Sequence, residues 1–244
     1  MYKLIAFDLD GTLTQHRSKL GETNRKVLEA LDKKYKLLMV GAGGCERIFN
    51  QLNFFPIDII GYYGMQESVM NNGVLKVVRS EFYTVDKQYF IDSANKIREK
   101  FGYTEYAGDN VEFHETGAVT IPLLGKSAPI EEKVAFDPDR KKRAVMYPYA
   151  KSLFEGFNVF IGGSSSFDIV KERFNKYNAL TEYMRKNGFD KSEVMYVGDD
   201  FGSGGNDEHV KTGGLNYTLL YFTILYYTLI DDYRNLGNKL AFLL

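Results

Sequence analysis

Two short apolar segments, far apart in the chain, each lead into carboxylates. Residues 2–7 run into Asp8 and Asp10. Residues 194–197 are followed two positions later by Asp199. In a chain whose other segments alternate between strand and helix patterns, such runs are typical of strands buried on both faces of a parallel sheet. Because an unpaired charge is costly to bury, the carboxylates belong at the carboxyl edge of that sheet, where α/β folds bind ligands.

The pattern changes near Phe82, where the regular alternation gives way to a different set of elements. Asp86 begins an amphipathic helix that Gly102 closes, and several short strand-like segments come after it. We expect a further helix with Pro138 in its first turn. Pro148 should then kink or break the helical segment around it, because proline lacks the amide that a helix interior needs.

The length of 244 residues allows one large or two modest domains. Strands and helices inserted between two halves of a parallel pattern predict a second domain that closes over the site of the first. We therefore expect an α/β protein whose doubly wound, Rossmann-like parallel-sheet core comprises residues 1–81 and 172–244. A mixed α/β cap domain is expected at residues 82–171.

The composition narrows the range of partners. The formal net charge is -1, so there is no global electrostatic case for binding nucleic acid or an anionic membrane. The single cysteine, Cys45, excludes an intramolecular disulfide, and the first residues lack the basic start and apolar centre of a signal peptide. We expect a cytoplasmic protein that acts on a small molecule.

The segment at residues 217–230 is apolar and aromatic, and it is too short to span a membrane. Exposed as a strand, it would favour aggregation, so we expect it to be covered. Two interpretations of the segment stay open: it is an edge strand of the core, or it forms a contact in a homodimer. The apolar pattern favours the strand.

The octet at residues 7–14, Phe-Asp-Leu-Asp-Gly-Thr-Leu-Thr, resembles the nucleophile motif of the haloacid dehalogenase superfamily, whose members mostly transfer phosphate groups. The resemblance implies that Asp8 attacks phosphorus and becomes an aspartyl phosphate, while Asp10 acts as acid and base. Residues two apart in an extended chain point the same way, so both carboxylates can address one phosphoryl group. Attack on a phosphate dianion requires neutralised charge, which predicts Mg²⁺ and a lysine elsewhere.

The second half of the chain narrows the resemblance. The order Gly162-Gly163, Ser166-Phe167-Asp168, Lys176, Gly198-Asp199 and Gly204-Gly205-Asn206-Asp207 is similar to that of the eukaryotic-type phosphomannomutases, a branch with a mixed α/β cap. Similarity to this branch implies that Lys176 neutralises the aspartyl phosphate. It also implies a magnesium site formed by Asp8, Asp199, Asp207 and the carbonyl of Asp10, with Asp207 also supporting its own loop. Side chains implied to face the sugar phosphate are those of Arg17, Ser166 and Asp168.

One departure from the superfamily pattern lies after the second predicted strand. Superfamily members end this strand in a serine or threonine that bonds to the phosphate, whereas this chain has four residues without a hydroxyl, Gly41 to Gly44. Backbone amides of a glycine turn can bind an anion, which makes Gly43 a candidate phosphate-binding residue. Alternatively, the turn only allows tight packing and the site is weakened.

A second departure concerns the cap. Phosphomannomutases hold the distal phosphate with arginines, and the matching positions here are His114, Lys126 and Lys133. These residues mostly keep the positive charge, but they lack the planar guanidinium of arginine, which binds phosphate through two parallel hydrogen bonds. The alternative is that these three residues are ordinary surface residues.

These observations predict a Mg²⁺-dependent phosphatase or phosphotransferase that acts on a small phosphorylated sugar or similar metabolite. The weaker phosphate grip favours hydrolysis over isomerisation. The alternative is a phosphomannomutase, which interconverts sugar 1- and 6-phosphates. A catalytically weak metabolite-binding or regulatory protein is a further alternative, supported only by the missing hydroxyl after Val40.

Overall fold

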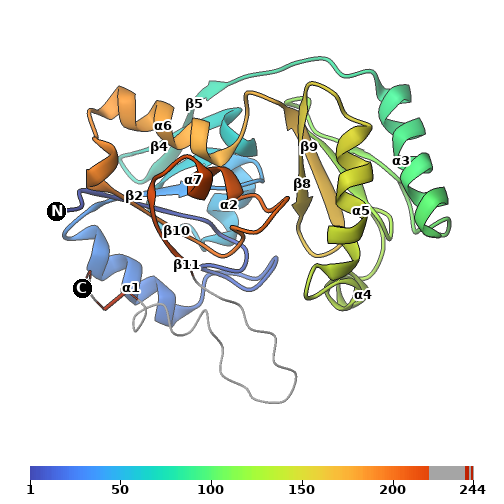
Figure 1. Ribbon diagram of the computed structural model, residues 1–244. Coiled ribbons are helices and arrows are strands. Elements are labelled where there is room, and N and C mark those ends of the chain that lie inside the picture. The colour runs from blue at the N-terminus through green and yellow to red at the C-terminus, as the bar shows by residue number, and fades with distance from the viewer. Residues whose placement is uncertain (220–239, 242, 244) are drawn as a thin grey trace. The chain divides into compact units, whose positions relative to one another are not determined.

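The computed structural model of the chain describes residues 1–219, 240–241 and 243. These residues form two compact units (Figure 1). The first contains Met1–Ser80, Lys176–Phe201 and the described residues from Asp207 onward, and the second contains Glu81–Asn175 and Gly202–Asn206. The predicted cap at residues 82–171 remains a prediction, because compactness alone does not test whether each part folds as a domain.

The first unit is built on a sheet of mixed direction. Within the described residues it has seven strands, in the spatial order β11 (Asn216–Leu219), β10 (Val194–Gly198), β1 (Leu4–Phe7), β2 (Lys36–Val40), β3 (Asp58–Gly61), β4 (Gln66–Asn71) and β5 (Val74–Ser80). Strands β11 to β3 are parallel, whereas β4 and β5 are antiparallel to their neighbours. The predicted α/β fold with a parallel central sheet is confirmed, and the two antiparallel strands at one edge modify it.

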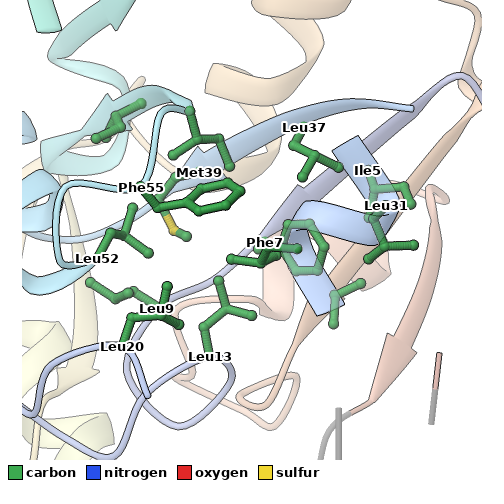
Figure 2. Packing of buried hydrophobic residues seen from close by; sticks show 14 of the residues in the cluster. Ile5, Phe7, Leu9, Leu13, Leu20, Leu31, Leu37, Met39, Leu52 and Phe55 are labelled. Atoms are coloured by element: carbon green, nitrogen blue, oxygen red, sulfur yellow. The ribbon is translucent and has the colours of Figure 1, made fainter. Parts of the chain in front are cut away.

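Helices cover both faces of this sheet. Alternate residues of β1 point to opposite sides, so Ile5 and Phe7 join the core formed with α1 (Glu22–Asp32) and α2 (Cys45–Gln51). Leu4 and Ala6 join the core formed with α6 (Lys176–Asn187) and α7 (Glu208–Thr212). Figure 2 shows the first of these cores, in which Phe7 lies among leucines. This double cover explains why the central strands are apolar throughout.

The parallel register fixes the position of the site. Phe7, the last residue of β1, is paired with Met39 on β2 and with Val197 on β10. The three strands therefore end together, and Asp8 and Asp199 follow at the same edge. Every residue of β1 and β10 is buried. Because burial of each large apolar side chain contributes about 1.5–3 kcal/mol, these strands form a stable support for the loops at their ends.

The second unit contains an antiparallel sheet with helices. Among the described residues its four strands have the order β6 (Glu112–Phe113), β7 (Val119–Pro122), β9 (Ser166–Lys171) and β8 (Phe157–Gly162). Its helices are α3 (Lys87–Phe101), α4 (Ile130–Phe136) and α5 (Lys141–Ser152), and α3 and α5 share the hydrophobic core with the sheet (Figure 1). Asp86 caps α3 by accepting from the amides of Gln88 and Tyr89, and Gly102 ends it with a φ of 77°.

Two local expectations for the second unit were wrong. Pro138 is not in the first turn of a helix, because α5 begins at Lys141. The Asp137 carboxylate accepts from the amides at the start of α5, so the Asp-Pro pair lies just before the helix. Pro148 lies inside α5 without ending it, so the expected break is wrong, while the expected kink stays a prediction. The missing helical hydrogen bond is offset by packing, since Met146 and Ala150 on either side of the proline are buried in the core.

Short 3₁₀ turns lie at Tyr62–Gly64 and Lys191–Glu193. Of the aromatic segment at residues 217–230, only the first three residues are described, and they belong to β11 at the edge of the larger sheet. The remainder lies outside the described residues, so the strand and the dimer contact both stay predictions. No helix within the described part of the chain has the length and apolar character needed to cross a membrane.

Candidate active site

Four side chains from separate elements meet at the carboxyl edge of the larger sheet. Asp8 follows β1, Asp199 follows β10, Asp207 precedes α7, and Lys176 is the first residue of α6. One carboxylate oxygen from each aspartate lies within 4.8 Å of the other two. The structure thus brings together four residues to which the sequence assigned roles, while the roles themselves remain predictions.

The ammonium group of Lys176 lies between two of these carboxylates. Its Nζ is 2.5 Å from Asp8 Oδ1 and 2.8 Å from Asp207 Oδ1, and the lysine side chain is fully buried. Removing a charge from water costs on the order of several kcal/mol, and breaking such a pair leaves an uncompensated charge. The lysine is therefore held as a fixed positive charge beside Asp8.

Asp207 is the anchor of this arrangement. In addition to Lys176, its Oδ1 accepts a hydrogen bond of 2.6 Å from the hydroxyl of Tyr196. Its Oδ2 accepts from the backbone amides of Asp199 and Asp200, at 3.2 and 3.1 Å. These four donors match the roughly four lone-pair sites of a carboxylate. The geometry therefore gives Asp207 a positioning role, which holds Lys176 and the turn after β10.

The charges in the cluster shift its proton equilibria. Burial raises the pKa of Asp8 to about 6, with smaller contributions from the negative charges of Asp207 and Asp10, and Lys176 opposes the rise. For Lys176, burial lowers the pKa, but attraction to Asp207 and Asp8 outweighs it, so the pKa is raised and the lysine stays charged. A divalent cation beside Asp8 would favour its ionised form.

Asp199 reaches the loop after β1 because Gly11 leaves room for it. A Cβ atom at Gly11 would lie 2.6 Å from Asp199 Oδ2, and the glycine has a φ of +92° that other residues rarely adopt. Thr12 Oγ1 lies 3.3 Å from Asp199 Oδ1 and 3.5 Å from Asp8 Oδ2. Carboxylate oxygens held side by side are the ligands that Mg²⁺ prefers, so these residues fit the predicted cation.

Asp10 is held by a separate set of donors. Its Oδ1 accepts from Gln51 Nε2 at 2.6 Å and from the backbone amide of Arg17 at 2.8 Å. Arg17 has a φ of 58°, and its side chain is exposed. The contact of Arg17 with Asp10 is thus made by the backbone, and the predicted contact of its guanidinium with substrate remains a prediction.

The glycine turn after β2 leads directly into α2. Gly44 is the residue before the helix, and the carbonyl of Gly43 accepts from the amide of Tyr62 at 2.9 Å. The guanidinium of Arg47 lies against Gly43, where a side chain would otherwise begin. Whether the Gly43 amide binds phosphate therefore remains a prediction, and a cationic side chain now lies beside it.

Two predicted substrate residues of the second unit are linked through Thr120. Its hydroxyl donates to Asp168 Oδ1 at 2.9 Å, and its oxygen lies 3.0 Å from His114 Nε2. The Thr120 hydroxyl already donates its proton to the Asp168 carboxylate. Its oxygen can therefore only accept a hydrogen bond from the histidine, which places a proton on His114 Nε2. His114 and Asp168 thus form one hydrogen-bonded group.

Lys126 and Lys133 form another group. The side chain of Lys133 is largely buried, and its Nζ donates to the backbone carbonyl of Lys126 at 2.7 Å. Lys126 itself pairs with Glu112 at 3.4 Å. The two lysines therefore lie together, and each already has an acceptor within the second unit.

Ser166 is fixed by a buried ion pair nearby. Arg143 Nε lies 2.8 Å from Asp137 Oδ2, and both side chains are excluded from solvent. Arg143 Nη1 donates to the carbonyls of Gly162 and Ser166, at 2.7 and 3.2 Å. The Ser166 hydroxyl donates to the same Gly162 carbonyl at 3.0 Å. Arg143 therefore sets the turn that precedes Ser166.

Sequence reasoning missed several side chains around the predicted site. Tyr196 lies inside a buried strand, where a tyrosine is usually read as core. Arg47 and Gln51 are four residues apart on α2, a spacing that places them on one helix face. A basic residue in the first turn of a helix that follows a glycine turn was the available signal for Arg47.

The fold is the one found in haloacid dehalogenase-like hydrolases. Among solved structures, a haloacid dehalogenase-like hydrolase from B. subtilis matches 88% of this chain and 88% of its own, with a TM-score of 0.55 and 15% identity. An IMP-bound, N-terminally truncated IMP-nucleotidase from Plasmodium falciparum matches 99% of this chain and 68% of its own, with a TM-score of 0.67 and 15% identity. At these identities the structures establish the fold alone.

Similarity in sequence supports a narrower assignment. The family model described as eukaryotic phosphomannomutase matches residues 24–214, and the chain belongs to that family. A phosphomannomutase of Saccharomyces cerevisiae is 25% identical over 221 residues, which cover 85% of this chain and 84% of the yeast protein. The resemblance to both the superfamily and this branch is thereby confirmed.

Proposed function

We propose that this chain is a Mg²⁺-dependent sugar phosphate mutase that interconverts the 1- and 6-phosphates of a hexose through an aspartyl phosphate on Asp8. The observation that carries the proposal is the buried cluster in which Lys176 joins Asp8 to Asp207. A nucleophilic carboxylate with a fixed cation beside it is what attack on a phosphate dianion requires.

In the proposed first step, an oxygen of Asp8 forms a bond to phosphorus while the bond from phosphorus to the sugar oxygen breaks. Lys176 offsets the added negative charge, and it can do so without rearrangement because Asp207, which Tyr196 holds in turn, already fixes its position. Mg²⁺, held by Asp8, Asp199 and the carbonyl of Asp10, would supply further charge neutralisation.

Asp10 is the proposed acid and base. It gives a proton to the departing sugar oxygen and later takes one from the incoming hydroxyl. Gln51 and the Arg17 amide both bond to Asp10 Oδ1, so we assign the proton transfer to Oδ2. Holding one oxygen leaves the other in a defined direction, which is the positioning that proton transfer needs.

The comparisons support the mutase more strongly than hydrolysis, which the cap residues had favoured. The matched family and the yeast relative are both named for mutase activity. The match also runs through the whole of the second unit up to residue 206. We propose that His114, Lys126, Lys133, Ser166 and Asp168 contact the sugar or its second phosphate.

Hydrolysis is the second candidate, and one observation favours it. The ammonium group of Lys133 is largely buried and already bonds to a backbone carbonyl, so it offers less to a phosphate than an arginine fork would. Isomerisation requires that the aspartyl phosphate pass its phosphoryl group to a sugar monophosphate, which gives a bisphosphate. A sugar monophosphate that is held loosely by its own phosphate would leave before this transfer, and water would then attack the aspartyl phosphate and release free phosphate.

The two candidates differ in their products. Mannose 1-phosphate or glucose 1-phosphate is supplied with Mg²⁺, with and without the corresponding 1,6-bisphosphate, while free phosphate and the 6-phosphate are followed together. For a mutase we expect the 6-phosphate to form faster than free phosphate, with stimulation by the bisphosphate. Phosphate release that outruns isomerisation under both conditions would make the protein a phosphatase, and Asp8→Asn provides the blank.

A further inference from the structure

The space beside Gly43 is occupied by the side chain of Arg47. A Cβ atom built on Gly43 would lie against Arg47 Nη2 and Nε, and 2.6 Å from Cζ. All three contacts fall below 3.0 Å, a separation that real Cβ atoms do not show. The guanidinium therefore lies in the place where a side chain at position 43 would begin.

Hydrogen bonds tie Arg47 to the loop that carries the nucleophile. Arg47 Nη1 donates to Gln51 Oε1 at 3.0 Å, one turn further along α2. Gln51 Nε2 in turn donates to Asp10 Oδ1 at 2.6 Å and to Thr14 Oγ1 at 3.0 Å. Arg47 Nη2 also lies 3.9 Å from Asp10 Oδ2. One glutamine thus sets the positions of both the proposed acid and the arginine.

The sheet places this guanidinium at the carboxyl edge, where Asp8 lies. β2 is the immediate neighbour of β1, and its residue Met39 is paired with Phe7, which precedes Asp8. The turn after β2, with Gly43, therefore ends beside the nucleophile loop. The arginine side chain is half exposed, with 50% of its surface accessible, so an incoming anion can reach it.

Lys176 and the proposed Mg²⁺ balance the carboxylates at this edge, but the charge of an incoming phosphoryl group is not yet balanced. Asp8, Asp199 and Asp207 converge there with Lys176 as the buried cation. A phosphoryl group brings further negative charge, and its oxygens require donors. A guanidinium offers two parallel N–H groups that match two phosphate oxygens.

We propose that Arg47 is a substrate-binding residue that holds the oxygens of the transferred phosphoryl group, in the place of a hydroxyl side chain at position 43. The proposal rests on the proposed phosphoryl transfer at Asp8. A side chain at position 43 would compete with the guanidinium for this place, since a Cβ there would displace the end of the arginine side chain.

The test is a pair of substitutions examined singly and together. Arg47→Ala should lower kcat/KM by about 10- to 100-fold, since it removes charge-assisted hydrogen bonds. Arg47→Lys should retain an intermediate rate. Gly43→Ser alone should also lower the rate, because it displaces the guanidinium. In the Arg47→Ala background, however, Gly43→Ser should restore at least a few-fold, because the hydroxyl then has room to bond to the phosphoryl group.

Two measurements separate this inference from the proposed function. Turnover of p-nitrophenyl phosphate reports phosphoryl transfer whatever the sugar, and the rise in thermal unfolding temperature with orthovanadate reports anion binding without turnover. Arg185→Ala, on an exposed arginine of α6, is the matched control and should leave both readouts unchanged.

We expect Arg47→Ala to weaken both readouts while its unfolding temperature without ligand stays that of the parent. An Arg47→Ala rate within twofold of the parent, or a loss that Gly43→Ser fails to relieve with vanadate binding intact, would overturn the assignment of Arg47. If instead the parent isomerises no sugar phosphate but its p-nitrophenyl phosphate turnover depends on Arg47, the mutase proposal fails and the role of Arg47 stands.

Discussion

Asp8 is a buried carboxylate, and its role as the nucleophile can be tested with a single substitution. It shares Lys176 with Asp207, and Thr12 Oγ1 lies 3.5 Å from its Oδ2. Asp8→Asn keeps the size of the side chain but removes the attacking charge. We expect turnover to fall by at least about three orders of magnitude. Circular dichroism should show a folded protein, and turnover close to that of the parent would contradict the covalent mechanism.

The raised pKa of Asp8 predicts how pH and Mg²⁺ act together. The unfolded chain releases this proton near its ordinary pKa of 3.8, whereas the folded chain holds it until about 6. The unfolded state therefore loses the proton first, and the contribution of Asp8 to the free energy of unfolding falls as pH rises through that window. Carboxylates bind Mg²⁺ in their ionised form, so if the cation binds at Asp8 it should raise the unfolding temperature more at pH 7.5 than at pH 5.

Differential scanning calorimetry with Mg²⁺ or with chelator tests this expectation. Asp8→Asn removes the titrating group, so its response to Mg²⁺ should be smaller and should vary less with pH. An equal Mg²⁺ shift at both pH values in the parent protein would show that the cation does not bind at Asp8.

Asp199 offers an independent test of the cation site. Its carboxylate lies against Gly11, in the loop that follows β1. Asp199→Ala should abolish turnover at ordinary Mg²⁺ concentrations and should mimic the effect of chelator on the parent. Asp32→Ala, on the exposed end of α1, is the control and should behave as the parent does. Normal turnover of Asp199→Ala would remove Asp199 from the metal site.

At the scale of elements, α5 depends on one buried ion pair. Arg143 joins Asp137 to the turn before β9, with both charged groups inside the second unit. Arg143→Met keeps much of the volume but leaves Asp137 as an unpaired buried charge. We expect it to reduce the free energy of unfolding by about 3–5 kcal/mol.

Urea unfolding followed by circular dichroism measures this loss. Lys141→Met on the same helix is the matched control, since Lys141 forms an exposed pair with Asp139 that solvent screens. A loss for Arg143→Met no larger than that of the control would show that the buried pair does not stabilise the second unit.

The sequence predicted elements better than their contacts. Central strands were found because burial on both faces leaves an unbroken apolar run, as in β1 and β10. The start of α5 was misplaced because Asp137 looks like a cap next to a proline, yet its carboxylate reaches amides five and six residues later. Arg47 was missed because its place beside Gly43 depends on how α2 lies against the glycine turn, and a basic residue in the first turn of a helix is a weak signal of that packing.

For the molecule as a whole, the balance between isomerisation and hydrolysis should depend on how tightly the second unit binds the second phosphate. Lys126→Arg with Lys133→Arg restores guanidinium forks at two of the three positions. If these residues hold the second phosphate, the ratio of 6-phosphate formed to phosphate released should rise about tenfold or more. Lys151→Arg, on an exposed lysine of α5, is the control. An unchanged ratio would place the second phosphate elsewhere.

The path of the chain also restricts how this architecture can be rearranged. The chain passes between the two units after Ser80, Asn175, Phe201 and Asn206, so the second unit is made of two separate segments. The short segment is bonded within that unit, since the carbonyl of Gly204 accepts from the amide of Ile161 at 2.8 Å. In the chain it lies between two members of the carboxylate cluster, Asp199 and Asp207. The second unit therefore cannot be exchanged between relatives as one continuous cassette, and a working chimaera needs residues 81–175 and 202–206 from the same parent.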